Sequence, residues 1–506
     1  MRNGVWRACL WTAALAAVSC RRPAQQSAPL TISVPFEIDT LDPHARNIAG
    51  NFAIASHFYE PLVLADPGLE LRPALAARWD NPDARTWIFH LRRGVRFHSG
   101  RALTSRDVVF SFQRLARTPA LEISVYLSGV GAVKALDAHT VELTTKRPSA
   151  ILLAALPFVL IVPEGSDSAA LAEREDGTGP YRLQSWTKPG EIRMARHDGY
   201  HGTKPAFGEV AFTLQRGPEQ ALQDLTAGRS RLVQCNSKTV EELTRGVAGL
   251  RVARKTSLFV KQLSFDLVRP ETPFVPGLPN PFRRREVREA VSLAIDRRAL
   301  VKRLSTYAMP ASQPLPPFVF GYDASLPVAA ADPARARALL GQAGYPDGFA
   351  VTLHVRAQFD ETARIVAEML SGVGIRTALA SMSDPEFFDL MNHDRLSFFL
   401  SRFGCPTGDA DLLFQQRFRT PMPGAGGRGA VFSPNLPALD AEIDASAEIV
   451  EMEKRHATLQ KLIRTVVEEV FWVPLYIDED VYALRDDLLW QPRSDSYVLA
   501  QEVGAR

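Results

Sequence analysis

Residues 86–111 read TWIFHLRRGVRFHSGRALTSRDVVFS, and they hold the clearest structural pattern in the chain. Apolar and polar side chains alternate over residues 87–91, which is the period of a strand with one buried face. Gly94 and Gly100 then offer the positive φ angles that tight turns need. Residues 104–107 (TSRD) have the form of a capping box, with Asp in place of Glu, and open a helix. The stretch therefore predicts a strand, turns and a helix in succession.

The same mixture of strand and helix patterns continues along the chain without an internal repeat. We expect another helix over residues 333–343, because Asp332 can cap it, Pro333 suits its first turn and Gly344 can end it. The apolar run of residues 151–162 (ILLAALPFVLIV) is too short to span a membrane and is interpreted as a core strand. Mixed elements throughout favour an α/β fold.

The length of the chain predicts a division into lobes. The chain has 506 residues, whereas a single hydrophobic core stops growing near about 250–300 residues. We therefore expect at least two lobes. The proline- and glycine-rich stretch of residues 269–281 (RPETPFVPGLPNP) lies near mid-chain and is the best candidate for a crossing between them.

The beginning of the chain has the organisation of an export signal. Arg2 and Arg7 give the chain a basic start. An eleven-residue apolar stretch without a charge, residues 8–18, follows them. At about 1.5 Å per residue this stretch cannot cross a bilayer core of about 30 Å. We therefore interpret residues 1–19 as a signal peptide.

The residues around the expected cleavage point allow two kinds of processing. Residues 15–20 (LAAVSC) resemble a bacterial lipobox, which implies lipidation of Cys20, although Ala17 stands where leucine is usual. Residues 17–19 would also suit an ordinary signal peptidase, which would leave Cys20 without lipid. In either case the polar residues 20–28 are expected to form a flexible tether.

Charge and motifs exclude several classes of function. Lys and Arg number 59 and Asp and Glu 56, so the net charge is +3, which is too balanced for a nucleic-acid or anionic-membrane partner. The sequence contains no nucleophile elbow, zincin helix, phosphate-binding lysine loop or dinucleotide fingerprint. We therefore predict no catalytic residue, no cofactor and no metal, and an exported enzyme becomes a minor alternative.

Three histidines and a glycine cluster receive structural interpretations. His197 and His201 have the spacing of helical metal ligands, but Gly199 lies between them, so we expect two loop histidines without a metal. His98 lies in a turn and is expected to be exposed. Residues 424–429 lack a following lysine and are interpreted as a loop rather than a phosphate cradle.

Several motifs in chain order resemble family 5 of the bacterial extracellular solute-binding proteins, the receptors of dipeptide, oligopeptide, nickel and related ABC importers. The resemblance begins with residues 39–44 (DTLDPH) and 58–63 (FYEPLV) and includes the stretch 86–111. The later motifs are residues 177–183 (GTGPYRL), 288–290 (REA), 294–297 (AIDR), 343–348 (AGYPDG) and 473–476 (VPLY). Each motif is weak alone, but their order is specific.

The resemblance implies an α/β fold of the type II periplasmic-binding-protein kind, with two lobes of mixed sheets around a hinged cleft. By analogy, lobe I consists of residues 29–262 and of the returning residues 476–506. Residues 59–174 form its extra subdomain. Lobe II consists of residues 263–475, and the two crossing segments make the hinge.

The resemblance also points to a loop of lobe II as part of the binding site. In peptide-binding relatives an aspartate of this loop takes the ligand's α-ammonium group. The corresponding residues here are 402–411 (RFGCPTGDAD), and their alignment places Cys405, Pro406 or Thr407 at the aspartate position. Asp409 could replace that acid after a shift of the loop. Alternatively the ligand lacks a free amine there, which favours neutral, planar or sugar-like ligands over a standard dipeptide.

Three further residues are candidates for contact with the ligand. Phe403 occupies a place where relatives often have tryptophan against the ligand, and a core phenylalanine is the alternative. Arg402 and Tyr126 are weaker candidates. Cys235 and Cys405 could form a disulfide, which the sequence leaves open.

The family implies a monomeric receptor that binds a peptide or similar small solute and delivers it to ABC permease subunits in the inner membrane. Its contact with the membrane would be through the lipid anchor alone, in the periplasm or cell envelope. A relative that works as a ligand sensor, chaperone or adhesin on the same scaffold is the alternative, since the loop of residues 405–407 departs from the family pattern.

Overall fold

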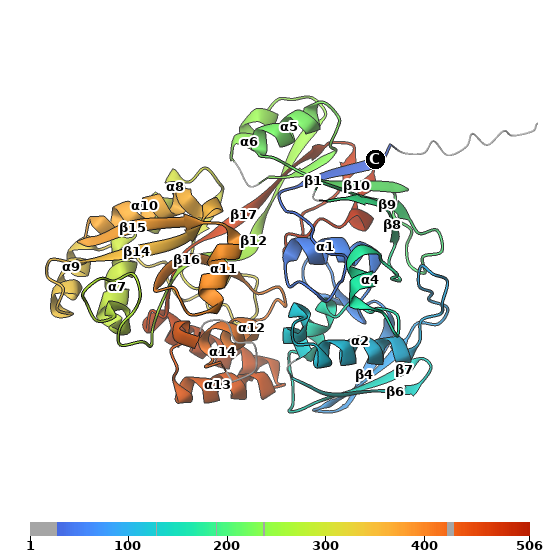
Figure 1. Cartoon of the computed structure of the whole chain (residues 1–506), viewed down its shortest axis with the longest axis horizontal. Helices are drawn as coiled ribbons and strands as arrows, with labels where there is room; N and C mark the ends of the chain where they lie inside the picture. The colour runs from blue at the N-terminus through green and yellow to red at the C-terminus, as the bar shows by residue number, and fades with distance from the viewer. Residues whose placement is uncertain (1–27, 128, 189, 236–237, 422–429) are drawn as a thin grey trace, which may run out of the picture.

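The structure of the protein is a computed structural model that describes residues 28–127, 129–188, 190–235, 238–421 and 430–506. The predicted signal peptide, Cys20 and the glycine cluster of residues 424–429 lie outside the described residues. Strands and helices form two α/β lobes side by side, as the sequence predicts (Figure 1). None of the described helices combines the length and the apolar character that a membrane span requires.

One eleven-stranded mixed sheet runs through both lobes in the order β15-β14-β16-β12-β17-β11-β1-β10-β9-β8, with β13 paired to β17. In its middle, the long strands β12 (Leu250–Phe265) and β17 (Trp472–Arg485) pair with each other in antiparallel fashion. The remaining strands are β1 (Leu30–Val34), β8 (Tyr181–Thr187), β9 (Glu191–Arg196), β10 (Glu209–Leu214), β11 (Leu232–Gln234), β13 (Ala308–Pro310), β14 (Phe349–Arg356), β15 (Ile375–Met382) and β16 (Phe398–Gly404). β1 is parallel to β10 and β11, and β14 is parallel to β15 and β16.

Two large hydrophobic cores share no residue. The core of lobe I draws on residues 30–232 and 482–503, so both ends of the chain build it. The core of lobe II draws on residues 263–476. β12 and β17 reach both lobes: Leu263 of β12 packs in lobe II, whereas Tyr482 of β17 packs in lobe I. The limits given above for the lobes and the subdomain stay predictions.

Lobe I carries a second, antiparallel sheet in the order β4-β5-β7-β6. Its strands are β4 (Ala76–Asp83), β5 (Thr86–Leu91), β7 (Thr140–Thr145) and β6 (Val130–Asp137), and α2 (Ser105–Arg117) packs on β6 and β7. Smaller elements complete the lobe: α1 (Ala49–Phe58), β2 (Val63–Ala65), β3 (Leu71–Pro73), the 3₁₀ turn Glu122–Leu127, α3 (Leu152–Ala155), α4 (Ser168–Glu173), β18 (Leu488–Leu489) and β19 (Gly504–Ala505).

The remaining helices belong mainly to lobe II. In lobe II they are α7 (Arg285–Ala294), α8 (Arg297–Arg303), α9 (Pro333–Gln342), α10 (Asp360–Ser371), α11 (Asp384–Asn392), α12 (Asp411–Leu413), α13 (Pro437–Glu448) and α14 (Met452–Glu468). α5 (Pro218–Thr226) and α6 (Lys238–Thr244) pack together near β11 and β17, at the top of Figure 1.

The local sequence signals of the opening stretch and of residues 333–343 are confirmed. Thr104 and Asp107 form the capping box at the start of α2. The side chain of Asp332 accepts a hydrogen bond of 2.9 Å from the backbone N–H of Arg335 and so caps α9. Gly344, just beyond that helix, has a φ of +87°, which costs glycine nothing.

Two local predictions are wrong. Residues 151–162 do not form a strand, since α3 and the 3₁₀ turn Leu156–Phe158 occupy most of them. A continuously apolar run has no period that separates strand from helix, and Pro157 fits the first turn of the 3₁₀ segment. His98 is buried rather than exposed, because its Nε2 lies 2.9 Å from the carbonyl of Gly179 and its Nδ1 pairs with Glu175.

Candidate ligand-binding site

The parallel strands of both lobes end in the middle of the molecule. β14 runs from the outer edge of lobe II toward the centre, and β1 runs toward the centre from the opposite side (Figure 1). In open α/β sheets, ligands bind outside the carboxyl ends of the strands. The loops and side chains that follow β1, β14 and β16 are therefore the first place to look for a site.

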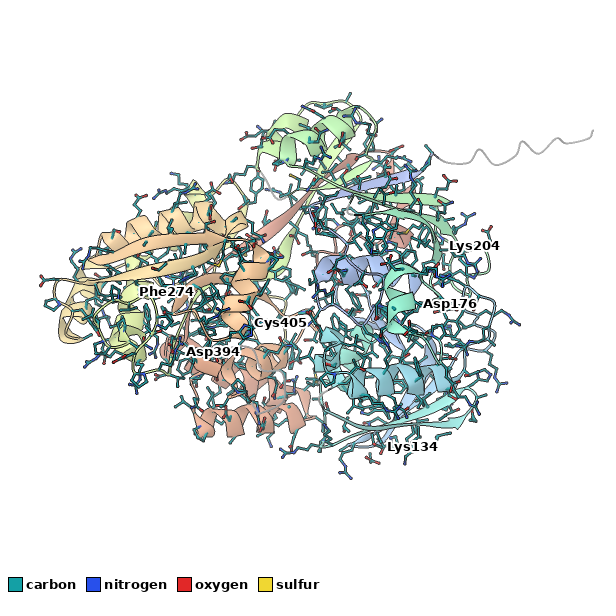
Figure 2. All side chains as sticks on the ribbon, viewed as in Figure 1. Lys134, Asp176, Lys204, Phe274, Asp394 and Cys405 are labelled. Atoms are coloured by element: carbon teal, nitrogen blue, oxygen red, sulfur yellow. The ribbon has the colours of Figure 1, made fainter. Side chains whose placement is uncertain are left out.

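The loop after β16 contains most of the predicted site residues. Cys405 lies on the side of lobe II that is turned toward lobe I (Figure 2), and its side chain is buried. Burial raises the pKa of its thiol, and the neighbouring Asp409 adds to the rise. Cys235 is also a buried free thiol and belongs to a different cluster, beside α5 and α6, so the two cysteines form no disulfide.

Phe403 points into lobe II. Its ring contacts that of Trp472, with centroids 6.1 Å apart, and only 7% of the residue is exposed. It belongs to a hydrophobic cluster with α12 and α14. Most contacts of Phe403 are therefore those of a core phenylalanine, which is the alternative that the sequence left open.

Asp409 is held by an arginine. Its two carboxylate oxygens accept hydrogen bonds from the two terminal nitrogens of Arg455, one of them at 2.8 Å, and Arg455 is 1% exposed. Thr407 lies in the same turn, and its hydroxyl donates to the carbonyl of Asp409 at 3.3 Å. Because the charge of Asp409 is already matched, an ammonium group of a ligand would have to compete with Arg455.

A second acid, Asp411, lies directly behind this pair. It is fully buried, and burial together with the charge of Asp409 raises its pKa to about 7. Its backbone N–H donates to Asp409 at 2.9 Å. Both acids of the loop therefore belong to its internal structure, and residues 404–408 contain no acidic side chain.

Tyr126 forms part of the facing wall of lobe I. Its ring stacks on Phe158 at 4.3 Å between centroids, and its hydroxyl donates to the Oδ1 atom of Asn47 at 3.1 Å. Burial raises the pKa of Tyr126, and Cys405 of lobe II adds to the rise. A Cβ atom on Gly408 would lie 3.6 Å from Leu69 of lobe I, so the loop after β16 approaches lobe I here.

The lobes also touch at the rim far from β12 and β17. The backbone N–H of Ala150 donates to the carbonyl of Ala447 at 3.2 Å, and Arg147 lies 3.3 Å from Glu448. These contacts join the segment after β7 to the end of α13. The two lobes are therefore in contact at this rim as well as at the loop after β16.

The side chains that the sequence analysis missed are two cations beside Arg402. Lys261 of β12 is the register partner of Arg402 in β16, and Arg356 ends β14. Lys261 and Arg356 lie over the same ring, Phe359, at 4.8 and 4.7 Å from its centroid. Their positions are 95 and 46 residues apart along the sequence (261, 356, 402), so only the strand order brings them together, and no local motif could have found them.

The two histidines at 197 and 201 are not brought together as a ligand pair. His201 bonds Glu60 at 2.9 Å, and His197 packs edge-on against His98 at 5.0 Å. Among the described residues, no group of three or more His, Cys, Asp or Glu side chains could hold a metal ion.

Two α/β lobes joined by a pair of crossing strands, with strand ends of both lobes turned toward the same centre, define a two-lobed binding protein of the type II periplasmic kind. The profile described as bacterial extracellular solute-binding proteins, family 5, matches residues 70–421. The chain belongs to this family.

Known relatives cover between about two thirds and nearly all of the chain. The glutathione-binding protein GsiB of Salmonella choleraesuis is 25% identical over 499 residues, which is 94% of this chain and 95% of that protein. The dipeptide-binding protein of Escherichia coli K12 is 28% identical over 386 residues, 69% of this chain and 70% of that protein. The structure of the periplasmic binding protein DppA from Helicobacter pylori, in complex with the peptide STSA, superposes with a TM-score of 0.83 at 22% identity and covers 94% of this chain and 98% of that chain.

Proposed function

We propose that this protein captures a peptide or a related small solute between its two lobes and delivers it to an ABC permease. The observation that carries the proposal is that, of the strands in the described residues, β12 and β17 alone continue the main sheet from one lobe into the other, while strand ends from both lobes meet beside them. The ligands named for the relatives, glutathione and dipeptides, have the size of such a solute.

The crossing strands offer a physical basis for opening and closing. Their register shifts between Thr256 and Val260, so the ladder of hydrogen bonds is interrupted near the middle of β12. A rotation of the lobes at this point would keep the buried residues of each large core together, because the two cores share no residue. Leu412 of α12, which packs on the core of lobe I, would move with lobe II.

Ligand would drive the closure through contacts that only the closed state makes. A solute that touches the loop after β16 and the wall of Tyr126 binds both lobes when they are closed and one lobe when they are open. A shift from 1% to 99% closed requires about 5.5 kcal/mol of preference for the closed state. A permease could then recognise the distance between the lobes rather than the solute.

We propose further that the protein acts as a monomer in the periplasm or cell envelope, without catalysis, and is tethered through lipid on Cys20. The family and the named relatives are binding proteins, which supports the absence of catalysis. The lipobox-like residues 15–20 support the tether. Metabolic labelling with a palmitate analogue is expected to label the wild type and not Cys20→Ala; an unlabelled wild type would show that the tether proposal is wrong.

Thermal denaturation in the presence of a peptide and small-solute library, including glutathione and Met-Leu, tests the proposed function. A bound solute raises the midpoint because it stabilises the folded state by RT ln(1 + [L]/Kd). We also expect the radius of gyration in X-ray scattering to fall with the same solute. Turnover of a solute would favour an enzyme, and binding without compaction would favour a sensor, chaperone or adhesin.

A further inference from the structure

Lys261 on β12, Arg402 on β16 and Arg356 at the end of β14 form a cluster of positive charge in lobe II, and this cluster carries an inference about the solute. Lys261 and Arg402 are directly opposite each other on β12 and β16, so their side chains leave the same face of the sheet about 5 Å apart at Cβ. Arg356 approaches the same face from the carboxyl end of β14 and shares the ring of Phe359 with Lys261.

The acids near this cluster do not balance it. Lys261 pairs with Asp478, and Arg356 lies 3.0 Å from Asp384. No carboxylate within the described parts of the chain pairs with Arg402, whose guanidinium lies 4.2 Å from the ring centre of Phe259. The cluster therefore keeps one uncompensated positive charge on an exposed side chain.

The neighbouring acids are already engaged. Asp409 is bonded to Arg455, and Glu361, on α10, accepts hydrogen bonds from the backbone and hydroxyl of Ser305. The side chain of Asp480, further along β17, accepts a hydrogen bond from Ser496. None of these three acids forms an ion pair with Arg402.

The three cations repel one another. Burial lowers the pKa of Arg356 to about 10, and the charge of Arg402 adds to that lowering. Burial also lowers the pKa of Lys261, with Arg402 and Arg356 among the further causes. A negative group beside Arg402 would relieve this repulsion. Stacking on Phe259 leaves the edge of the guanidinium free for a bidentate bond to a carboxylate or phosphate.

We propose that Arg402, supported by Arg356 and Lys261, binds an anionic group of the solute, and that the cargo is an organic acid without a free amine. This inference rests on the proposed function and adds the charge class of the solute. The absence of a free amine is inferred from two observations. The loop of residues 404–408 contains no acid for an ammonium group, and the charge of Asp409 is already compensated by Arg455. The shared chemistry of the predicted solutes is a carboxylate or phosphate with no cationic partner.

Three forms of one dipeptide test the inference by titration calorimetry: N-acetyl-Met-Leu, which is an anion, Met-Leu, which is a zwitterion, and Met-Leu amide, which is a cation. We expect the acetylated acid to bind the wild type at least tenfold more tightly than the amide and more tightly than Met-Leu. Arg402→Gln is expected to weaken binding of the acetylated acid at least tenfold without changing the melting temperature of the unliganded protein. Arg402→Lys keeps the charge but not the bidentate edge, so we expect it to bind the acetylated acid more tightly than Arg402→Gln and more weakly than the wild type.

Arg106→Gln is the matched control, since Arg106 is an exposed arginine on α2 in lobe I and the substitution changes the net charge by the same amount. Equal or tighter binding of Met-Leu or its amide, or an unchanged affinity in Arg402→Gln, would overturn the inference and leave the proposed function intact. If none of the three forms binds, native mass spectrometry of the co-purified solute decides. An anionic solute supports the inference, whereas a neutral or cationic solute contradicts the inference and leaves the proposed function intact. If no solute is bound and the library gives no stabilisation, the proposed function is contradicted as well.

Discussion

Replacement of Asp411 by asparagine is expected to change how the stability of the protein depends on pH. Asp411 is fully buried, with a pKa raised to about 7 from an unfolded value of 3.8 by burial and by Asp409. Because the folded-state pKa is the higher one, the folded protein binds the additional proton between these two values. The contribution of Asp411 to the free energy of unfolding is therefore most favourable at low pH and is lost as the pH rises toward 7.

The size of the effect follows from the two pKa values. Each unit of difference corresponds to about 1.4 kcal/mol, so between pH 5 and pH 8 the wild type is expected to lose about 3 kcal/mol at this residue. Asparagine has the same shape and no charge, so Asp411→Asn lacks this loss, and the stability of the variant relative to the wild type rises with pH. Urea denaturation at pH 5, 6, 7 and 8, followed by fluorescence and circular dichroism, measures the difference. Asp486→Asn, at an exposed turn, is the control. Parallel pH curves for the wild type and Asp411→Asn would refute the reasoning.

Three further perturbations follow from the packing and the caps. Gly348→Ala is expected to destabilise lobe II by about 1–3 kcal/mol, because φ is +70° and a Cβ atom would clash with the backbone oxygen of Gly374. Gly341→Ala, where a Cβ atom inside α9 would meet no neighbouring heavy atom within 4 Å, should add about 0.5–1 kcal/mol in the same urea assay. Equal effects of the two substitutions would contradict the comparison. Asp332→Ala removes the cap of α9 and should cost about 1 kcal/mol, with no change expected if the cap bond does not form in solution. Arg147→Glu places like charges at the rim contact with Glu448 and should favour the open state by less than about 1 kcal/mol. We expect a larger radius of gyration at low salt, which the added substitution Glu448→Arg reverses. A radius that responds to neither change would show that the rim contact does not affect closure.

The candidate site could be predicted only in part. The sequence points to the loop of residues 402–411 through its resemblance to the family, and the alignment puts Cys405, Pro406 or Thr407 at the position of the usual acid. It could not show that Asp409 is held by Arg455, because the two residues are 46 positions apart and meet only through the packing of α14. Lys261 and Arg356 likewise could not be identified as neighbours of Arg402 from the sequence. Neither belongs to a recognisable motif, and only the strand order brings them together.

The burial of single residues was also beyond the sequence. His98 lies next to Ser99 and Gly100 in a turn, which favours exposure, yet Glu175 and the carbonyl of Gly179 surround its ring. Residues 151–162 are apolar at nearly every position, so their pattern was equally compatible with a strand and with the short helices observed.

The amino-acid sequence by itself determined the properties that depend on neighbours along the chain: the caps of α2 and α9, the alternation in β5, the turn at Gly94, and the ordered motifs that identify the family. These signals act over a few residues, where backbone geometry and local hydrogen bonds decide the outcome. Only the tertiary structure decided which charges meet, because strand order and helix packing bring together residues that are far apart in the sequence. The balance between Arg402, its two neighbouring cations and their acids is set by that arrangement, and it determines the charge that we infer for the solute.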